Sequence, residues 1–187
     1  MLKIGDTLHG FTVKRIRALC EIDAKLIEME HSSGAELAFL ERRDSNKSFG
    51  ISFKTLPEDD TGVFHILEHS VLCGSEKFPL KEPFVDLLKS SLKTFLNAMT
   101  YNDKTVYPVA SRNDRDFYNL VDIYMDAVLH PLAVTDERVF RQEGWHYELS
   151  ENGELSYNGV VYNEMKGAYS SPEGVAEEQI MKRLGLR

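Results

Sequence analysis

Two histidines and a glutamate lie close together in the sequence, in the pattern His-x-x-Glu-His formed by His65, Glu68 and His69. If this stretch is helical, His69 lies about 40° around the helix from His65, and Glu68 about 60° in the other direction. All three side chains could therefore face one ion. Neutral histidine nitrogens suit Zn²⁺, and a carboxylate that does not bind the metal can take a proton from water. The pattern predicts a hydrolytic zinc site that needs a third ligand from elsewhere.

This spacing is the reverse of the His-Glu-x-x-His zinc protease motif and is known as the inverzincin pattern. Random placement of the six histidines and the glutamates would give about 0.02 such patterns, which makes coincidence a poor explanation. The alternative is two surface histidines beside an unrelated glutamate. Apolar residues interleaved with the pattern predict a mostly buried helix, where histidine and glutamate need partners that a metal can supply. Cys73 is a further candidate ligand, although a reduced structural thiol is the better interpretation.

The composition is that of one globular domain, with 187 residues, of which 42% are hydrophobic and 28% charged. A net charge of −8 argues against non-specific binding to nucleic acid, which requires clustered lysine and arginine. Two cysteines, Cys20 and Cys73, encode no disulfide framework and favour a reducing compartment. The sequence starts without an apolar signal core and contains no apolar run of about 18 residues. These features predict a cytoplasmic protein with no nucleic-acid or membrane partner.

The first third of the chain partly alternates apolar with polar residues, which predicts a meander of three or four antiparallel strands. The expected strands are Phe11–Leu19, Lys25–Glu30, Glu36–Leu40 and Ser48–Phe53. The histidine-bearing helix should follow, with Asp60 or Thr61 as its N-cap and Gly74 as its C-cap glycine.

The remaining two thirds predict mostly helices. Apolar residues recur every three or four positions from Asp114 to His130, which indicates an amphipathic helix capped by Asn113. The other expected elements are a helix around Phe84–Ser90, a hairpin of Lys93–Tyr101 with Lys104–Ala110, helices over Asp136–Tyr147 and Gly159–Tyr169, and helical residues from there to Arg187. Strands followed by helices predict the α+β class, an antiparallel sheet with helices packed on one face, in one domain over residues 1–187.

Five stretches, in this order, resemble motifs of the pitrilysin-like zinc peptidases. They are His65–His69, Leu72–Ser75, Asn97–Thr100, Gln142–Trp145 and Gly159–Gly167. The resemblance covers nearly the whole chain and is strongest to the branch that contains presequence protease and falcilysin. Five motifs in the family order are far more specific than the histidine pattern alone.

The resemblance implies a role for each matching residue. His65 and His69 would bind one zinc ion per chain, Glu68 would be the general base, and Glu164 would be the third protein ligand. Without the resemblance, Glu164 would be interpreted as a solvated helix carboxylate. Two histidines, a glutamate and a water molecule form an open catalytic zinc site.

The resemblance also implies that peptide substrates bind as an added strand along Asn97, Ala98 and Met99, because main-chain hydrogen bonds suit any peptide sequence. The alternative is that these are ordinary paired strand residues. Gln142–Trp145 could orient a metal ligand, although capping or packing would need the same residues.

Members of this branch are several times longer than this chain. They have four related domains that enclose a chamber, and the distal half supplies an arginine and a tyrosine near the scissile bond. The resemblance therefore implies an N-terminal fragment that lacks the closing elements of its domain and its expected partner, the C-terminal half. Such a fragment would carry the metal half of a composite site and have little or no activity alone.

The implied function is that of a zinc-dependent metalloendopeptidase that degrades short unfolded peptides through attack by a zinc-bound water activated by Glu68. The alternative is a non-catalytic peptide-binding or assembly module with the same fold. The intact set of His65, Glu68, His69 and Glu164 argues against that alternative. A metal-free structural domain would require all five motif matches to be coincidental.

Overall fold

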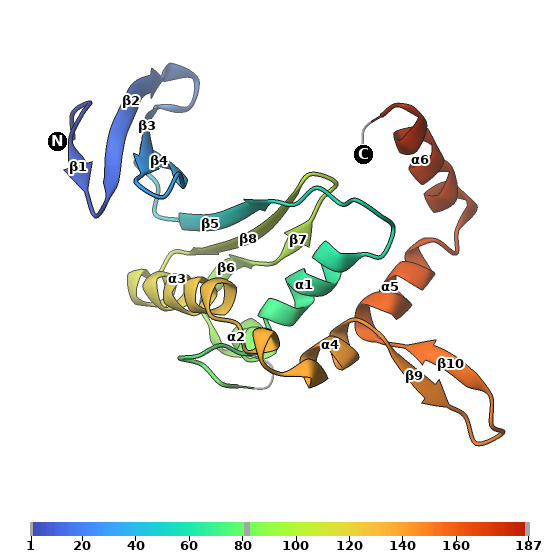
Figure 1. Cartoon of the computed structure of the whole chain (residues 1–187). Helices are drawn as coiled ribbons and strands as arrows, with labels where there is room; N and C mark the ends of the chain where they lie inside the picture. The colour runs from blue at the N-terminus through green and yellow to red at the C-terminus, as the bar shows by residue number, and fades with distance from the viewer. Residues whose placement is uncertain (1, 81–82, 186–187) are drawn as a thin grey trace. The chain divides into compact units, whose positions relative to one another are not determined.

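The computed structural model describes residues 2–80 and 83–185, and Figure 1 shows its helices and strands. The chain forms two compact units, Met1–Ser45 and Asn46–Arg187. Each unit has its own hydrophobic core.

The first unit is a four-stranded antiparallel meander in the order β1-β2-β3-β4. Its strands are β1 (Thr7–Leu8), β2 (Phe11–Leu19), β3 (Ala24–His31) and β4 (Glu36–Arg42), with a 3-10 turn at Cys20–Ile22. Val13 on β2 lies opposite Met29 on β3, and both side chains are buried together with Ile27. Cross-strand neighbours share a face, so these three residues form the small core of the unit.

The second unit contains a sheet with the order β5-β8-β6, in which a short strand, β7, also pairs with β8. Its strands are β5 (Lys47–Lys54), β6 (Lys93–Leu96), β7 (Met99–Thr100) and β8 (Lys104–Ser111). The stretch Ser48–Phe53, expected to be a fourth strand of the meander, instead belongs to β5 in this sheet. The polar residues 43–46 end the first sheet, and β5 then pairs along all its residues with β8.

Three helices pack on one face of this sheet, as the predicted α+β class requires. They are α1 (Val63–Val71), α2 (Pro83–Ser90) and α3 (Asp114–Leu129) (Figure 1). Tyr107 and Val109 of β8 point to the same face, because they are two residues apart. They pack with Leu120 and Tyr124 of α3, both almost fully buried. As predicted, the side chain of Asn113 caps α3.

The ends of α1 differ from the prediction. Its N-cap is Gly62, in the left-handed region at φ 72°, and no side chain caps the helix. Neither expected cap, Asp60 or Thr61, is at this position. Thr61 instead donates from its amide and hydroxyl to Asp59 in the preceding turn. At the other end the cap position is Leu72, because the helix ends at Val71. Gly74, the expected cap, lies in the following turn.

The predicted strand Lys93–Tyr101 is divided into β6 and β7 by Asn97 and Ala98. The break lies opposite Pro108 of β8, which has no amide hydrogen to donate to a neighbouring strand. The amide of Asn97 still donates to the Pro108 carbonyl at 3.2 Å.

The last third continues from α3 through a 3-10 turn, Leu132–Val134. It contains α4 (Glu137–Glu143), a hairpin of β9 (His146–Leu149) and β10 (Leu155–Asn158), α5 (Val160–Ala168) and α6 (Pro172–Arg183). The predicted helix Asp136–Tyr147 therefore ends early, and its last two residues begin β9.

The hairpin of β9 and β10 was not predicted from the sequence. The sequence feature that indicates it is a large apolar residue at every second position, at Tyr147 and Leu149 and again at Leu155 and Tyr157. Between these pairs lies Asn152-Gly153, a turn pair typical of hairpins. The final helix ends at Arg183, and the expectation that helical residues continue to Arg187 extends outside the described residues. Within residues 2–80 and 83–185, every helix is too short or too polar to cross a membrane.

Candidate metal centre

His65 and His69 lie one turn apart on α1, and their side chains are 20% and 26% exposed. Their rings are in edge-on contact, with centroids 5.0 Å apart. The helix is held on its other sides by Val71 in the core and by α4, which contacts α1. Both rings are thus supported by a packed helix and not by a loop.

Glu164 on α5 completes a group of three residues that could hold a metal ion. Its Oε2 atom lies 3.6 Å from Nε2 of His65 and 3.5 Å from Nε2 of His69. Ligand atoms arranged tetrahedrally around zinc, at about 2.0–2.2 Å from it, are about 3.4 Å apart. The distances from Glu164 to the two histidines are close to this spacing, and all three ligand atoms lie within 4.8 Å of one another. Two imidazoles and a carboxylate are also ligands that suit zinc.

Glu143, at the end of α4, contacts the ring of His69 at Nδ1, the nitrogen that does not face Glu164. Its Oε2 is 3.3 Å from Nδ1 of His69, and its Oε1 accepts from the amide of Gln142 at 2.8 Å. This hydrogen bond raises the pKa of His69 and lowers the pKa of the buried Glu143 carboxyl. With Nδ1 occupied by Glu143, the other nitrogen, Nε2, is the one directed at Glu164.

Cys73, the other ligand candidate considered from the sequence, lies beside Glu143. Its Sγ is 3.5 Å from Oε1 of Glu143 and 3.5 Å from the carbonyl oxygen of His69. In the described part of the chain, the group able to hold a metal consists of His65, His69 and Glu164.

Glu68 is 7% exposed and lines the same cleft as the two histidines. The nearby phenol of Tyr107 has a raised pKa, first because it is buried and second because of the charge of Glu68. The carboxylate of Glu68 is thus positioned beside the metal-capable group without belonging to it.

The cleft has a volume of about 800 Å³ and brings the metal-capable group together with the expected peptide-binding residues. Asn97, Ala98 and Met99 line it, as do Phe84 and Val85 of α2. Among the described strands, β7 pairs only with β8, so no described strand occupies its second edge. Nothing in the sequence singles out Phe84 and Val85 as cleft residues, because their spacing is also that of ordinary helix packing.

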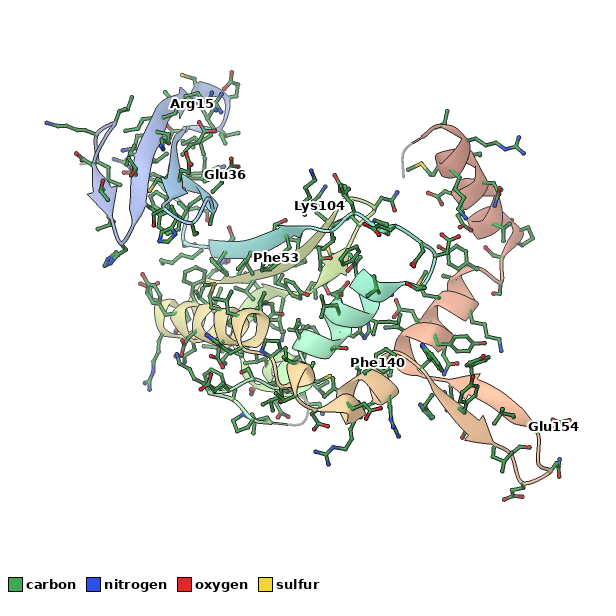
Figure 2. The ribbon with its side chains drawn as sticks, viewed as in Figure 1. Arg15, Glu36, Phe53, Lys104, Phe140 and Glu154 are labelled. Atoms are coloured by element: carbon green, nitrogen blue, oxygen red, sulfur yellow. The ribbon has the colours of Figure 1, made fainter. Side chains whose placement is uncertain are left out.

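The stretch Gln142–Trp145 is divided between two environments. Gln142 and Glu143 line the cleft, whereas Trp145 packs edge-on against Tyr147 and Tyr157 of the hairpin. Figure 2 shows the side chains of this region, with Glu154 labelled at the far tip of the hairpin.

The sequence matches the model of the insulinase family, peptidase family M16, over residues 56–179. The chain therefore belongs to peptidase family M16. The pitrilysin-like relationship predicted from the five motifs is confirmed.

The relatives include Protein HypA of Clostridium perfringens, which is 58% identical over 180 residues, 95% of this chain and 18% of the relative. Presequence protease 1 of Arabidopsis thaliana, chloroplastic/mitochondrial, is 56% identical over 168 residues, 89% of this chain and 16% of the relative. The mitochondrial presequence protease of Mus musculus is 41% identical over 187 residues, 97% of this chain and 18% of the relative. The chain thus spans less than a fifth of the length of these curated relatives.

The crystal structure of pitrilysin has the same fold, with a TM-score of 0.57 and 22% sequence identity. The match covers 69% of this chain and 14% of pitrilysin. It agrees with the predicted class of an antiparallel sheet with helices on one face.

Proposed function

We propose that residues 1–187 form a zinc-binding peptidase domain in which His65, His69 and Glu164 hold one Zn²⁺ and Glu68 is the general base. The observation that carries the proposal is the approach of Glu164 to both histidine Nε2 atoms, at 3.5 and 3.6 Å, beside the buried Glu68. Membership of a peptidase family supports it independently.

The chemistry follows from the positions of these side chains. Bound zinc would act as a Lewis acid that lowers the pKa of a water molecule and polarises a peptide carbonyl. Glu68 accepts the proton of the attacking water and returns it to the nitrogen of the leaving amine. Glu143 favours the tautomer of His69 with a free Nε2 lone pair, because its carboxylate accepts a hydrogen bond from Nδ1–H in that tautomer.

The substrate class that we propose is a short, unfolded peptide cleaved at internal bonds. The second edge of β7 pairs with no described strand and supports this proposal, because an extended peptide could add there as a strand through main-chain hydrogen bonds. Asn97, Ala98 and Met99 would then run along the peptide, with the scissile bond near Glu68. Folded proteins do not offer an extended main chain to such an edge.

Zinc binding tests the centre directly. The metal-free chain is titrated with Zn²⁺ against a chromophoric chelator, next to the Glu164→Gln and Glu68→Gln variants. We expect one tight zinc per chain, at least about tenfold weaker binding for Glu164→Gln, and unchanged binding for Glu68→Gln. Loss of zinc in Glu68→Gln would mean that this residue is a ligand and not the base, and absence of zinc from the wild type would reject the centre.

Activity needs a separate test, because the relatives are several times longer. This chain is substituted for the matching stretch of Arabidopsis presequence protease 1, to which it is 56% identical. We expect the chimera to cleave a fluorogenic peptide and its Glu68→Gln variant to lose about 10³-fold or more in rate. Zinc and peptide bound without cleavage would instead favour the non-catalytic peptide-binding module.

A further inference from the structure

The helices that carry the candidate ligands meet at two glycines. Gly144 follows α4, and Gly159 immediately precedes α5. A Cβ atom added to Gly159 would lie 2.2 Å from the carbonyl oxygen of Gly144 and 2.8 Å from the Cα of Trp145. Both are backbone atoms, which cannot rotate away as a side chain can. Glycine at position 159 therefore allows the start of α5 to touch the backbone that follows α4.

Gly144 makes the second contact, toward α1. A Cβ atom added there would lie 3.1 Å from Cγ2 of Ile66 and 2.9 Å from Cε2 of Phe140. Ile66 is adjacent to His65 in α1, and Figure 2 shows Phe140 on α4, in the region where α1 and α4 meet. The start of α5 thus packs on Gly144, and Gly144 packs on the helix that carries both histidines.

This junction fixes the position of Glu164. Glu164 lies on the second turn of α5, and its side chain is 55% exposed, so its own packing does little to hold it. Within α5 only Val161 is buried. A shift of α5 by about 1 Å would be half the length of a zinc–oxygen bond. The approach of the carboxylate to the histidines therefore depends on the glycine contact at the start of its helix.

We propose that Gly144 and Gly159 are positioning residues for the metal centre, whose backbone contact sets the distance from Glu164 to His65 and His69. This inference rests on the proposed function, because it treats Glu164 as a zinc ligand. It adds two residues that touch neither metal nor substrate and act only through the placement of α5.

The test compares two alanine substitutions that bracket the same helix. Gly159→Ala introduces the backbone clash, whereas Gly167→Ala is the control, because a Cβ at position 167 meets nothing within 4 Å. Zinc affinity is measured by chelator competition. The stability of the metal-free proteins is measured by thermal unfolding. We expect Gly159→Ala to weaken zinc binding about tenfold or more, as Glu164→Gln does, and Gly167→Ala to stay within about twofold of the wild type.

A double-mutant cycle separates positioning from general damage to the fold. In the Glu164→Gln background, Gly159→Ala should weaken zinc no further, because the ligand that it displaces is already gone. An equal loss in both backgrounds, or wild-type affinity in Gly159→Ala, would overturn the inference. If Gly159→Ala does not fold, Gly144→Ala tests the other side of the junction. Its added Cβ would lie 2.9 Å from both Cε2 and the carbonyl oxygen of Phe140 and 3.1 Å from Cγ2 of Ile66. Zinc binding of wild-type strength in a folded Gly144→Ala would likewise overturn the inference. A wild type that binds no zinc would overturn the proposed function as well.

Discussion

At the scale of single residues, the candidate centre depends on side chains that face each other from distant parts of the chain. His69 lies between Glu143, at 3.3 Å from its Nδ1, and Glu164, at 3.5 Å from its Nε2. One carboxylate is buried and the other is half exposed, and we propose different roles for them. In this proposal the buried one orients the ring, and the exposed one binds the metal.

The orienting role of Glu143 predicts a measurable effect on zinc. Glu143→Gln keeps the shape of the side chain but removes the charge that stabilises the Nδ1 proton of His69. We expect zinc affinity to fall by about 10- to 100-fold, as for other residues that orient metal ligands. Glu137→Gln, on the exposed side of the same helix, is the control and should change little. Zinc affinity equal to that of the wild type in Glu143→Gln would contradict the role.

At the scale of elements, α3 is tied to the loop after α1 by a buried carboxylate. Asp126 accepts from the backbone amide of Lys77 at 2.8 Å and lies 3.2 Å from Nδ1 of His130. The Ser75 hydroxyl, the Lys77 amide and the His130 ring together lower its pKa, against the opposing effect of burial. A lowered pKa means that the charged form stabilises the fold.

This tie predicts a pH-dependent stability difference between the wild type and Asp126→Asn. A lowered folded-state pKa adds stability above the unfolded pKa of about 3.9, and this stability is lost as pH falls through the folded value. At pH 7 the free energy of unfolding of the variant should be about 1–3 kcal/mol lower than that of the wild type. This difference should shrink below pH about 4. Urea unfolding from pH 3 to 7 measures it.

The matched control is Asp122→Asn, because Asp122 is an exposed partner of the Lys77 ammonium. Its effect should be below about 1 kcal/mol. A gap for Asp126→Asn that stays constant down to pH 3 would show that the charge of Asp126 does not stabilise the fold.

Local patterns in the sequence are sufficient to predict part of the candidate metal centre. The spacing of His65, Glu68 and His69 is local to one helix, and the period of that helix fixes their common direction. Glu164 has no such local signal. Its approach to the two histidines depends on the contact between Gly144 and Gly159, which brings α5 close to α1. The motifs of the family supplied it, and the chain's own periodicity did not.

The same division explains the misplaced elements. Asn113 caps α3 through its own side chain, and this local chemistry was predictable. The break between β6 and β7 depends instead on Pro108 in a neighbouring strand, and no pattern within residues 93–101 indicates it. β5 likewise joins β8 because of pairing far along the chain.

At the scale of the whole molecule, the two units have separate cores, and every residue of the candidate centre belongs to the second. Val13→Ala, in the first core, should destabilise β2 and β3 by about 1–3 kcal/mol, because Val13 is 1% exposed. Zinc affinity should stay within about twofold of the wild type. Hydrogen exchange and chelator competition measure the two quantities, with the exposed Leu8→Ala as the control. A parallel loss of zinc would show that the first core supports the metal centre.

The unequal exposure of the three proposed ligands has a consequence for the rate at which a metal enters and leaves. The side chains of the two histidines are 20% and 26% exposed, whereas that of Glu164, which lines the same cleft, is 55% exposed. A small chelator would displace the carboxylate first, so release would proceed in steps and speed up with chelator concentration. A peptide bound along β7 would occupy the same cleft. If the proposed function is correct, bound peptide would slow metal exchange, and a protein saturated with peptide would keep its zinc longest.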